Sequence, residues 1–183
     1  MIHFPRIIND SVHGQIELDN HLMQFVDSPY YQRLRGISQL GCVSYVFPGA
    51  THSRFSHGIG TAHLSNVYLS HLSQSEPHLS EEKLRKRDKE IVEIAALCHD
   101  IGHGPFSHAF DDFICNRIGS KQWNHEERSC QIVEKIIDEK GLDFNGDDVK
   151  KIQSIVKPGI CNFRLNLNCS ETNLFIRRKK FCC

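Results

Sequence analysis

Runs of apolar residues at helical spacing, each closed by glycine or proline, constrain this chain to a mostly helical fold. Apolar side chains that recur every three or four residues place one helix face against a core, and glycine or proline then ends the helix. A short extended segment is expected at residues 43–47, before Pro48. The fold class is therefore all-α, a helical bundle with a short extended or β-hairpin segment. The pattern predicts helices over residues 19–27, 30–39, 53–73, 91–98, 106–118 and 147–156, and between the cap Asn124 and Gly141.

Three segments carry more detailed expectations. The charged run over residues 81–90 is expected to form a solvated helical face. From residue 159 onward asparagines interrupt any period, so the tail over residues 159–183 is expected to be poorly ordered. In the helix over residues 53–73, the apolar face is expected to consist of Leu64, Val67, Tyr68, Leu69 and Leu72.

Composition places the chain among globular intracellular proteins. Its 183 residues suit one domain, with 39% hydrophobic and 24% charged residues and no apolar run long enough to span a membrane. Twenty-two basic and 22 acidic residues cancel, so bulk charge does not indicate nucleic-acid binding, although a local basic pocket stays open. The N-terminus has no signal or transit pattern, and the eight cysteines lack metal-finger spacing and are interpreted as free thiols.

Histidines concentrate in the middle of the chain, where residues 98–108 read Cys-His-Asp-Ile-Gly-His-Gly-Pro-Phe-Ser-His. Neutral imidazole and carboxylate are ligands for a divalent metal that performs hydrolysis. His99 and Asp100 would diverge by about 100° within a helix, but they can converge on one ion where a glycine ends it. His57, near the start of an earlier helix, is the natural third ligand.

These residues admit two other interpretations. A single histidine beside an aspartate is usually a satisfied structural pair, but three histidines within ten residues, flanked by glycines, favour a functional site. His99 and His103 also have the i, i+4 spacing of a helical zinc protease motif. That motif needs a glutamate base and an intact helix, whereas this chain has Asp100 and Gly102.

Several blocks in order resemble one family, the SAM- and HD-domain-containing dNTP triphosphohydrolases with their viral and bacterial relatives. The blocks are residues 9–14, 32–35, 39–41, 47–57 and 98–108, and the similarity covers residues 3–157. The resemblance implies an HD-domain helical bundle over residues 1–158. It also implies hydrolysis of dNTPs, dGTP foremost, to deoxynucleoside and inorganic triphosphate, with a divalent ion such as Zn, Fe, Mn or Mg.

The resemblance also implies a role for individual residues. For three residues the sequence without this resemblance gives a plainer interpretation: Asp27 would be a helix end, Arg35 would be a solvated charge, and Asn9 would be a turn residue. The implied metal ligands are His57, His99 and Asp100. Substrate contacts are implied for Arg54 at the phosphate and for Gln39 and Leu40 beside the sugar and base. Triphosphate binding and proton transfer are implied for His103, His108, Asp111 and His125. A regulatory guanine-nucleotide site at an oligomer interface is implied for Asn9, Asp27, Gln32 and Arg35.

The chain also departs from the family pattern. The family's fourth metal ligand is an aspartate in a later Asn-Gly-Ile-Asp-like block, which is not found here, and the divergence begins near Pro158. Three ligands are expected to hold a metal more loosely than four. The alternative to a weakened enzyme is a non-catalytic chain that binds nucleotide or modulates longer relatives in a mixed oligomer. Hydrolysis of another phosphate ester by the same HD-type chemistry is a third hypothesis. The family resemblance suggests a nuclear location, and the cytoplasm is the alternative.

Overall fold

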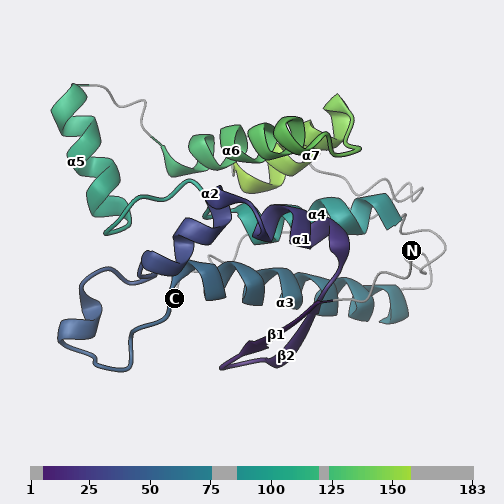
Figure 1. The fold of residues 1–183 in the computed structure, drawn as a ribbon, viewed down its shortest axis with the longest axis horizontal. Coiled ribbons are helices and arrows are strands. Elements are labelled where there is room, and N and C mark those ends of the chain that lie inside the picture. The colour runs from purple at the N-terminus through teal and green to yellow at the C-terminus, as the bar shows by residue number, and fades with distance from the viewer. Residues whose placement is uncertain (1–5, 76–85, 120–123, 158–183) are drawn as a thin grey trace.

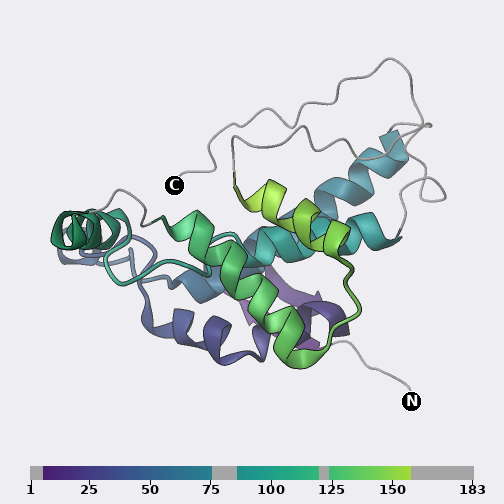
Figure 2. The ribbon, with the colours of Figure 1, turned by 90° about the horizontal axis from the view of Figure 1, so that it is seen from above.

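The computed structural model describes residues 6–75, 86–119 and 124–157, and within them the chain is mostly helical, as expected (Figure 1). A small hairpin precedes the helices, and α5 stands apart at one end of the molecule in both views (Figures 1 and 2). The strands are β1 (Arg6–Asp10) and β2 (Gly14–Leu18), and the helices are α1 (Asn20–Val26), α2 (Pro29–Gln32), α3 (Arg54–Ser75), α4 (Lys86–Cys98), α5 (His108–Ile118), α6 (His125–Lys140) and α7 (Gly146–Val156).

Helix α4 lies at the centre of the core. Its residues Ile91, Ile94 and Cys98 are fully buried, because their helical spacing places them against α3, α1 and α7. The buried face of α3 consists of Phe55, Ile59, Ala62 and Leu69.

The expected apolar face of α3 was therefore partly wrong. Leu69 is buried and Leu72 is half-buried, but Leu64, Val67 and Tyr68 are exposed. Both stripes have helical spacing, so periodicity alone could not decide which one faces α4. The contact with α4 selected the stripe that contains the small residues Gly58 and Ala62.

The extended structure lies elsewhere than expected. Residues 43–47 were expected to be extended, but Val43–Tyr45 form a short 3₁₀ helix, and the Phe47 N–H donates to the Val43 carbonyl at 2.8 Å. A strand needs a partner for its backbone groups, and this segment bonds locally instead. The hairpin forms between β1 and β2, with Ile8 opposite Ile16 and a turn at Gly14 (φ 73°).

Helix boundaries follow the local signals. Asn124 caps α6 by accepting the Glu126 N–H at 2.7 Å, and Gly141 ends that helix in the left-handed conformation. The helix expected over residues 30–39 is shorter, because α2 ends at Gln32 and a 3₁₀ turn (Arg33–Gly36) follows. The first part of the charged run, residues 81–85, and the tail over residues 159–183 lie outside the described residues.

None of the helices in the described ranges is long and apolar enough to cross a membrane.

Candidate metal and phosphate site

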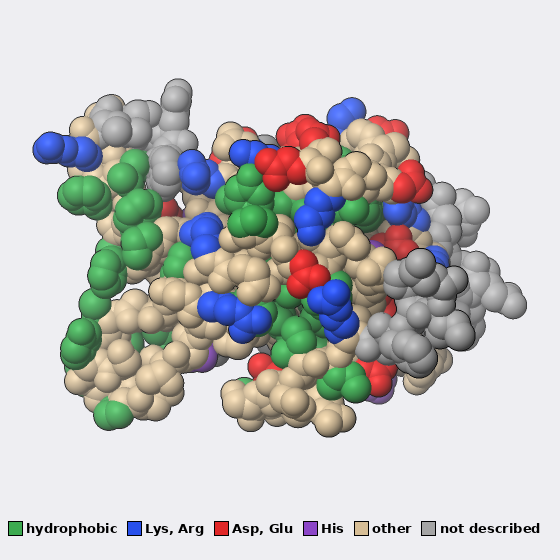
Figure 3. Space-filling model, viewed as in Figure 1, with side chains coloured by type: hydrophobic (Ala, Val, Ile, Leu, Met, Phe, Trp, Pro, Cys, Tyr) green, Lys and Arg blue, Asp and Glu red, His purple; other side chains and the backbone are tan. Residues whose placement is uncertain are grey.

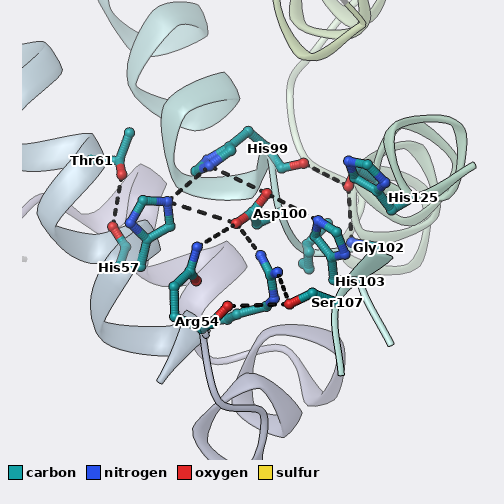
Figure 4. Close-up of polar contacts among 12 residues, drawn as sticks. Arg54, His57, Thr61, His99, Asp100, Gly102, His103, Ser107 and His125 are labelled. Atoms are coloured by element: carbon teal, nitrogen blue, oxygen red, sulfur yellow. Dashed lines mark hydrogen bonds and ion pairs between the residues drawn. The ribbon is translucent and has the colours of Figure 1, made fainter. Parts of the chain in front are cut away.

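The start of α3 and the end of α4 bring His57, His99 and Asp100 together (Figure 4). The Nε2 atoms of the two histidines are 3.1 Å apart, and His99 Nε2 lies 3.4 Å from Asp100 Oδ1. Gly58 permits this approach, since a Cβ there would lie 2.4 Å from the Tyr31 hydroxyl and 2.8 Å from the Leu97 carbonyl oxygen. The three side chains predicted as metal ligands therefore converge, each with one donor atom within 4.8 Å of the others.

The backbone after α4 holds His99 in a defined orientation. The His99 Nδ1–H donates to the Ala96 carbonyl at 2.8 Å, which leaves Nε2 to face His57 and Asp100. The Ser129 hydroxyl of α6 donates to the His99 carbonyl at 2.8 Å and accepts the Gly102 N–H at 2.9 Å. Helix α6 thus fixes the turn in which the ligands lie.

The protonation states suit a metal. Burial, followed by the neighbouring His99 ring, lowers the pKa of His57, which favours the neutral imidazole. Burial alone would raise the pKa of Asp100, but the neighbouring His99 ring, the Arg54 guanidinium and the His103 and His57 rings hold that pKa below its ordinary value. A neutral imidazole and an ionised carboxylate are the forms that bind divalent ions, so these residues fit a metal.

Arg54 and Gln39 surround the Asp100 carboxylate. Arg54 is 3% exposed and donates from Nη1 to Asp100 Oδ2 and from Nη2 to the Ser107 hydroxyl at 2.7 Å. Gln39 Nε2 donates to Asp100 Oδ2 at 3.4 Å, and Leu40 beside it is half-buried. Gln39 Oε1 and Arg54 Nε are buried without a hydrogen-bond partner in the described structure. Buried polar atoms normally have a hydrogen-bond partner, so these two atoms are candidate contacts for water, an ion or a polar ligand.

A second group of side chains lies next to the first. The rings of His103 and His125 are stacked with centroids 3.8 Å apart, and the His125 Nδ1–H donates to Asp111 Oδ2 at 2.9 Å. His108 is exposed, with Nδ1 3.8 Å from the same oxygen. His103 Nε2 lies 3.6 Å from Asp100 Oδ1, so Asp100 connects both groups. Burial lowers the pKa of His103 to about 3.

The structure adds residues that the sequence did not indicate. The Ser107 hydroxyl accepts a hydrogen bond from Arg54 and donates one to the Gln39 carbonyl at 3.2 Å. The backbone φ is positive at Phe106 (62°) and at Ser107 (55°). Positive φ in two successive residues other than glycine is strained and requires support from surrounding contacts. Arg33 donates to the Ile101 and His103 carbonyls. No signal in the sequence distinguishes these side chains from ordinary loop and helix residues.

The four residues predicted to bind a regulatory nucleotide lie in β1, at the end of α1, in α2 and in the 3₁₀ turn after α2. Gln32 accepts the Arg35 Nε–H at 2.8 Å, and the Arg35 guanidinium lies 3.6 Å from the Phe55 ring centroid. Asp27 forms an ion pair with Arg6 at 2.8 Å. Asn9 lies in β1 opposite Gln15. Gln32 and Arg35 are thus in contact.

A helical bundle with a histidine–aspartate group at the junction of two helices defines a candidate metal-centre protein. The model of the HD domain matches residues 54–158, so this chain belongs to the HD-domain family, whose members are metal-dependent.

Relatives extend the comparison beyond the HD domain. A deoxynucleoside triphosphate triphosphohydrolase SAMHD1 homolog of Dictyostelium discoideum is 44% identical over 153 residues, and the SAMHD1 protein of Homo sapiens is 44% identical over 138 residues. An HD domain-containing protein of Acanthamoeba polyphaga mimivirus is 34% identical over 165 residues. These alignments cover 83%, 75% and 85% of this chain, but only 29%, 22% and 36% of the relatives.

Proposed function

We propose that this chain is a metal-dependent phosphohydrolase that cleaves dNTPs, dGTP first among them, to deoxynucleoside and inorganic triphosphate. The observation that carries the proposal is the position of Asp100. It joins a metal-ligating group, His57 and His99, to the histidine cluster through His103 and to a buried guanidinium, Arg54. The two SAMHD1 relatives are named as deoxynucleoside triphosphate triphosphohydrolases, which supports dNTPs as the substrate class.

The chain's own residues divide the chemistry between them. His57, His99 and Asp100 would hold a divalent ion, whether Zn, Fe, Mn or Mg, which would supply Lewis-acid polarisation of a phosphate oxygen and lower the pKa of a bound water. Arg54 donates a hydrogen bond to Asp100, and in this proposal its positive charge binds the phosphates while Gln39 and Leu40 contact the sugar and base.

Proton transfer falls to the histidine cluster. Asp111 accepts the His125 Nδ1–H, which leaves Nε2 of that ring free to exchange a proton, and His103 and His108 complete the cluster. Water adds to the α-phosphorus, the bond to the nucleoside 5′ oxygen breaks, and that oxygen receives a proton from the cluster. The products are deoxynucleoside and triphosphate.

The test is incubation of the purified chain with dGTP and Mg²⁺ or Mn²⁺, with products separated by ion exchange. Deoxyguanosine and triphosphate are expected in equal amounts, and Asp100→Asn and His125→Asn should each lower the rate by about a hundredfold or more. His71→Ala, on an exposed position of α3, is the matched control. Release of pyrophosphate or phosphate instead, or no turnover by folded protein, would overturn the proposal.

A second candidate is a non-catalytic subunit that binds nucleotide or modulates longer relatives. It is favoured by exposed apolar side chains near the site, among them Tyr45, Val46 and Phe47 before α3 and Phe106 and Phe113 at α5. Figure 3 shows hydrophobic side chains along the edge of the molecule that carries α5. An exposed apolar patch marks an interaction surface. Light scattering of the chain alone and mixed with a longer relative, with triphosphate release as the readout, tests this role.

We further propose GTP or dGTP as a regulator that binds at Asn9, Asp27, Gln32 and Arg35. The contact between Gln32 and Arg35 and the ion pair of Asp27 support a polar surface of this kind. GTP should raise the thermal unfolding temperature of the wild-type chain and not that of Arg35→Ala. An equal shift in both proteins would contradict the assignment.

A further inference from the structure

We propose that His103, Asp111 and His125, with His108 as fourth ligand, form a second transition-metal site that holds α5 against α6. The bound ion would be of borderline softness, such as Zn²⁺, because such ions favour imidazole and carboxylate ligands. The site adjoins the group of His57, His99 and Asp100 through His103, and an ion bound in it would compete with phosphate binding and proton transfer by the same side chains.

The first observation is the donor set. His103, Asp111 and His125 each offer a donor atom within 4.8 Å of the others, and this is one of two such groups in the described residues. His108 lies close to both partners, with its ring centroid 5.1 Å from that of His125 and Nδ1 3.8 Å from Asp111 Oδ2. Three imidazoles and one carboxylate complete a tetrahedral zinc shell.

The second observation is an unsatisfied buried atom. His103 is 2% exposed, and its Nδ1 has no hydrogen-bond partner in the described structure. A buried imidazole nitrogen without a partner has a lone pair or a proton unused, and a metal ion would use the lone pair.

The third observation is the position of α5. This helix stands apart from the stacked helices in both ribbon views, and the positive φ of Phe106 and Ser107 immediately precedes it (Figures 1 and 2). The hydrogen bond from His125 to Asp111 and the packing of Phe110 against Gly104 connect α5 to the body. Zinc ligands at about 2.1 Å lie about 3.4 Å apart in a tetrahedron, so metal binding would draw α5 inward slightly.

The primary test measures how many metal ions each chain binds in the absence of nucleotide. The chain is dialysed against buffered Zn²⁺, and bound metal is measured by mass spectrometry. Two ions per wild-type chain are expected, with one lost in Asp111→Asn and in His125→Ala. His57→Ala should lose the other ion, and His71→Ala should keep both. The proposal would be overturned if Asp111→Asn and His125→Ala bind as much metal as the wild-type chain, whereas a single wild-type ion that these two variants lose would count against the site of His57, His99 and Asp100 instead.

A second measurement separates this site from cysteine binding and from misfolding. Co²⁺ bound by nitrogen and oxygen ligands gives visible absorption without the near-ultraviolet charge-transfer band of thiolates. His57→Ala, which retains the second site, should show this signature and slower amide exchange in α5 on Co²⁺ addition. Unchanged α5 exchange, or a thiolate band, would count against the site. Circular dichroism of each variant establishes folding, and failure of dGTP cleavage would leave these readouts unaffected.

Discussion

Asp100 is the residue on which the candidate site depends most. Its Oδ2 accepts hydrogen bonds from Arg54 and Gln39, while its Oδ1 lies 3.4 Å from His99 Nε2 and 3.6 Å from His103 Nε2. The neighbouring His99 ring and the Arg54 guanidinium hold the pKa of the carboxyl group below its ordinary value despite its burial. A change at Asp100 therefore affects metal binding and the alignment of Arg54 together.

His103 makes the metal-free chain sensitive to acid. Its pKa in the folded chain is about 3, whereas the unfolded chain takes up this proton near pH 6.5, so the unfolded state binds more protons between these values. The free energy of unfolding should fall as pH falls through this window, by at most about 1.4 kcal/mol per pH unit from this residue. Urea unfolding of the wild-type chain and of His103→Gln at several pH values measures this dependence. If the free energy of unfolding changes with pH equally in both proteins, the lowered pKa of His103 is contradicted.

Gly102 is required for a close approach of backbones. A Cβ at Gly102 would lie 2.2 Å from the His125 carbonyl oxygen and 2.5 Å from the Ser129 nitrogen, and backbone atoms cannot move aside cheaply. Gly102→Ala should lower the free energy of unfolding by about 1–3 kcal/mol. Gly36→Ala is the matched control, because no atom lies within 4 Å of its Cβ position. Equal free energies of unfolding for the two variants in urea would show that the backbone near Gly102 moves away from the added Cβ at little cost.

At the scale of elements, the start of α7 is linked to α4 through one carboxylate. The Asn145 side chain accepts the Asp147 and Asp148 N–H groups at 2.9 Å, and the Asp148 carboxylate accepts the Asn145 N–H at 3.3 Å. The Arg87 Nε–H of α4 donates to Asp148 at 3.1 Å. A capping box therefore also positions a side chain that joins two helices.

This cap gives a prediction at the same scale. Asn145→Ala should lower the free energy of unfolding by about 1 kcal/mol, because the first N–H groups of α7 lose their acceptor. Asn145→Gly should cost only a few tenths of a kcal/mol, roughly. Chemical denaturation of both variants measures the difference, and equal losses would indicate that the helix start is held by Arg87 and packing alone.

The sequence predicted helices better than it predicted strands. The limits of α6 were evident because Asn124 and Gly141 act on their own neighbours, and such signals need no tertiary contact. The hairpin of β1 and β2 was not assigned, since its pairing joins short segments with weak alternation. The segment at residues 43–47 has strand propensity but no partner strand.

At the scale of the whole molecule, metal binding should couple to folding. The ligands come from α3 and from the turn after α4, so an ion bound there stabilises the folded chain only. Mn²⁺ at about 100 times its dissociation constant should add about 2.7 kcal/mol, or about 5–10 °C in unfolding temperature for a chain of this size. His57→Ala should lose most of this shift and His71→Ala should keep it. A shift of the same size in all three proteins would place the ion elsewhere.

The sequence by itself determined the helical class, several helix ends and the types of residue in the site. These follow from local spacing, capping and the chemistry of His57, His99 and Asp100. Only the tertiary structure decided which stripe of α3 is buried, and it brought Ser107 to Arg54 and Ser129 to the turn after α4. These contacts join residues at least 30 positions apart, and their geometry depends on how whole helices pack against α4.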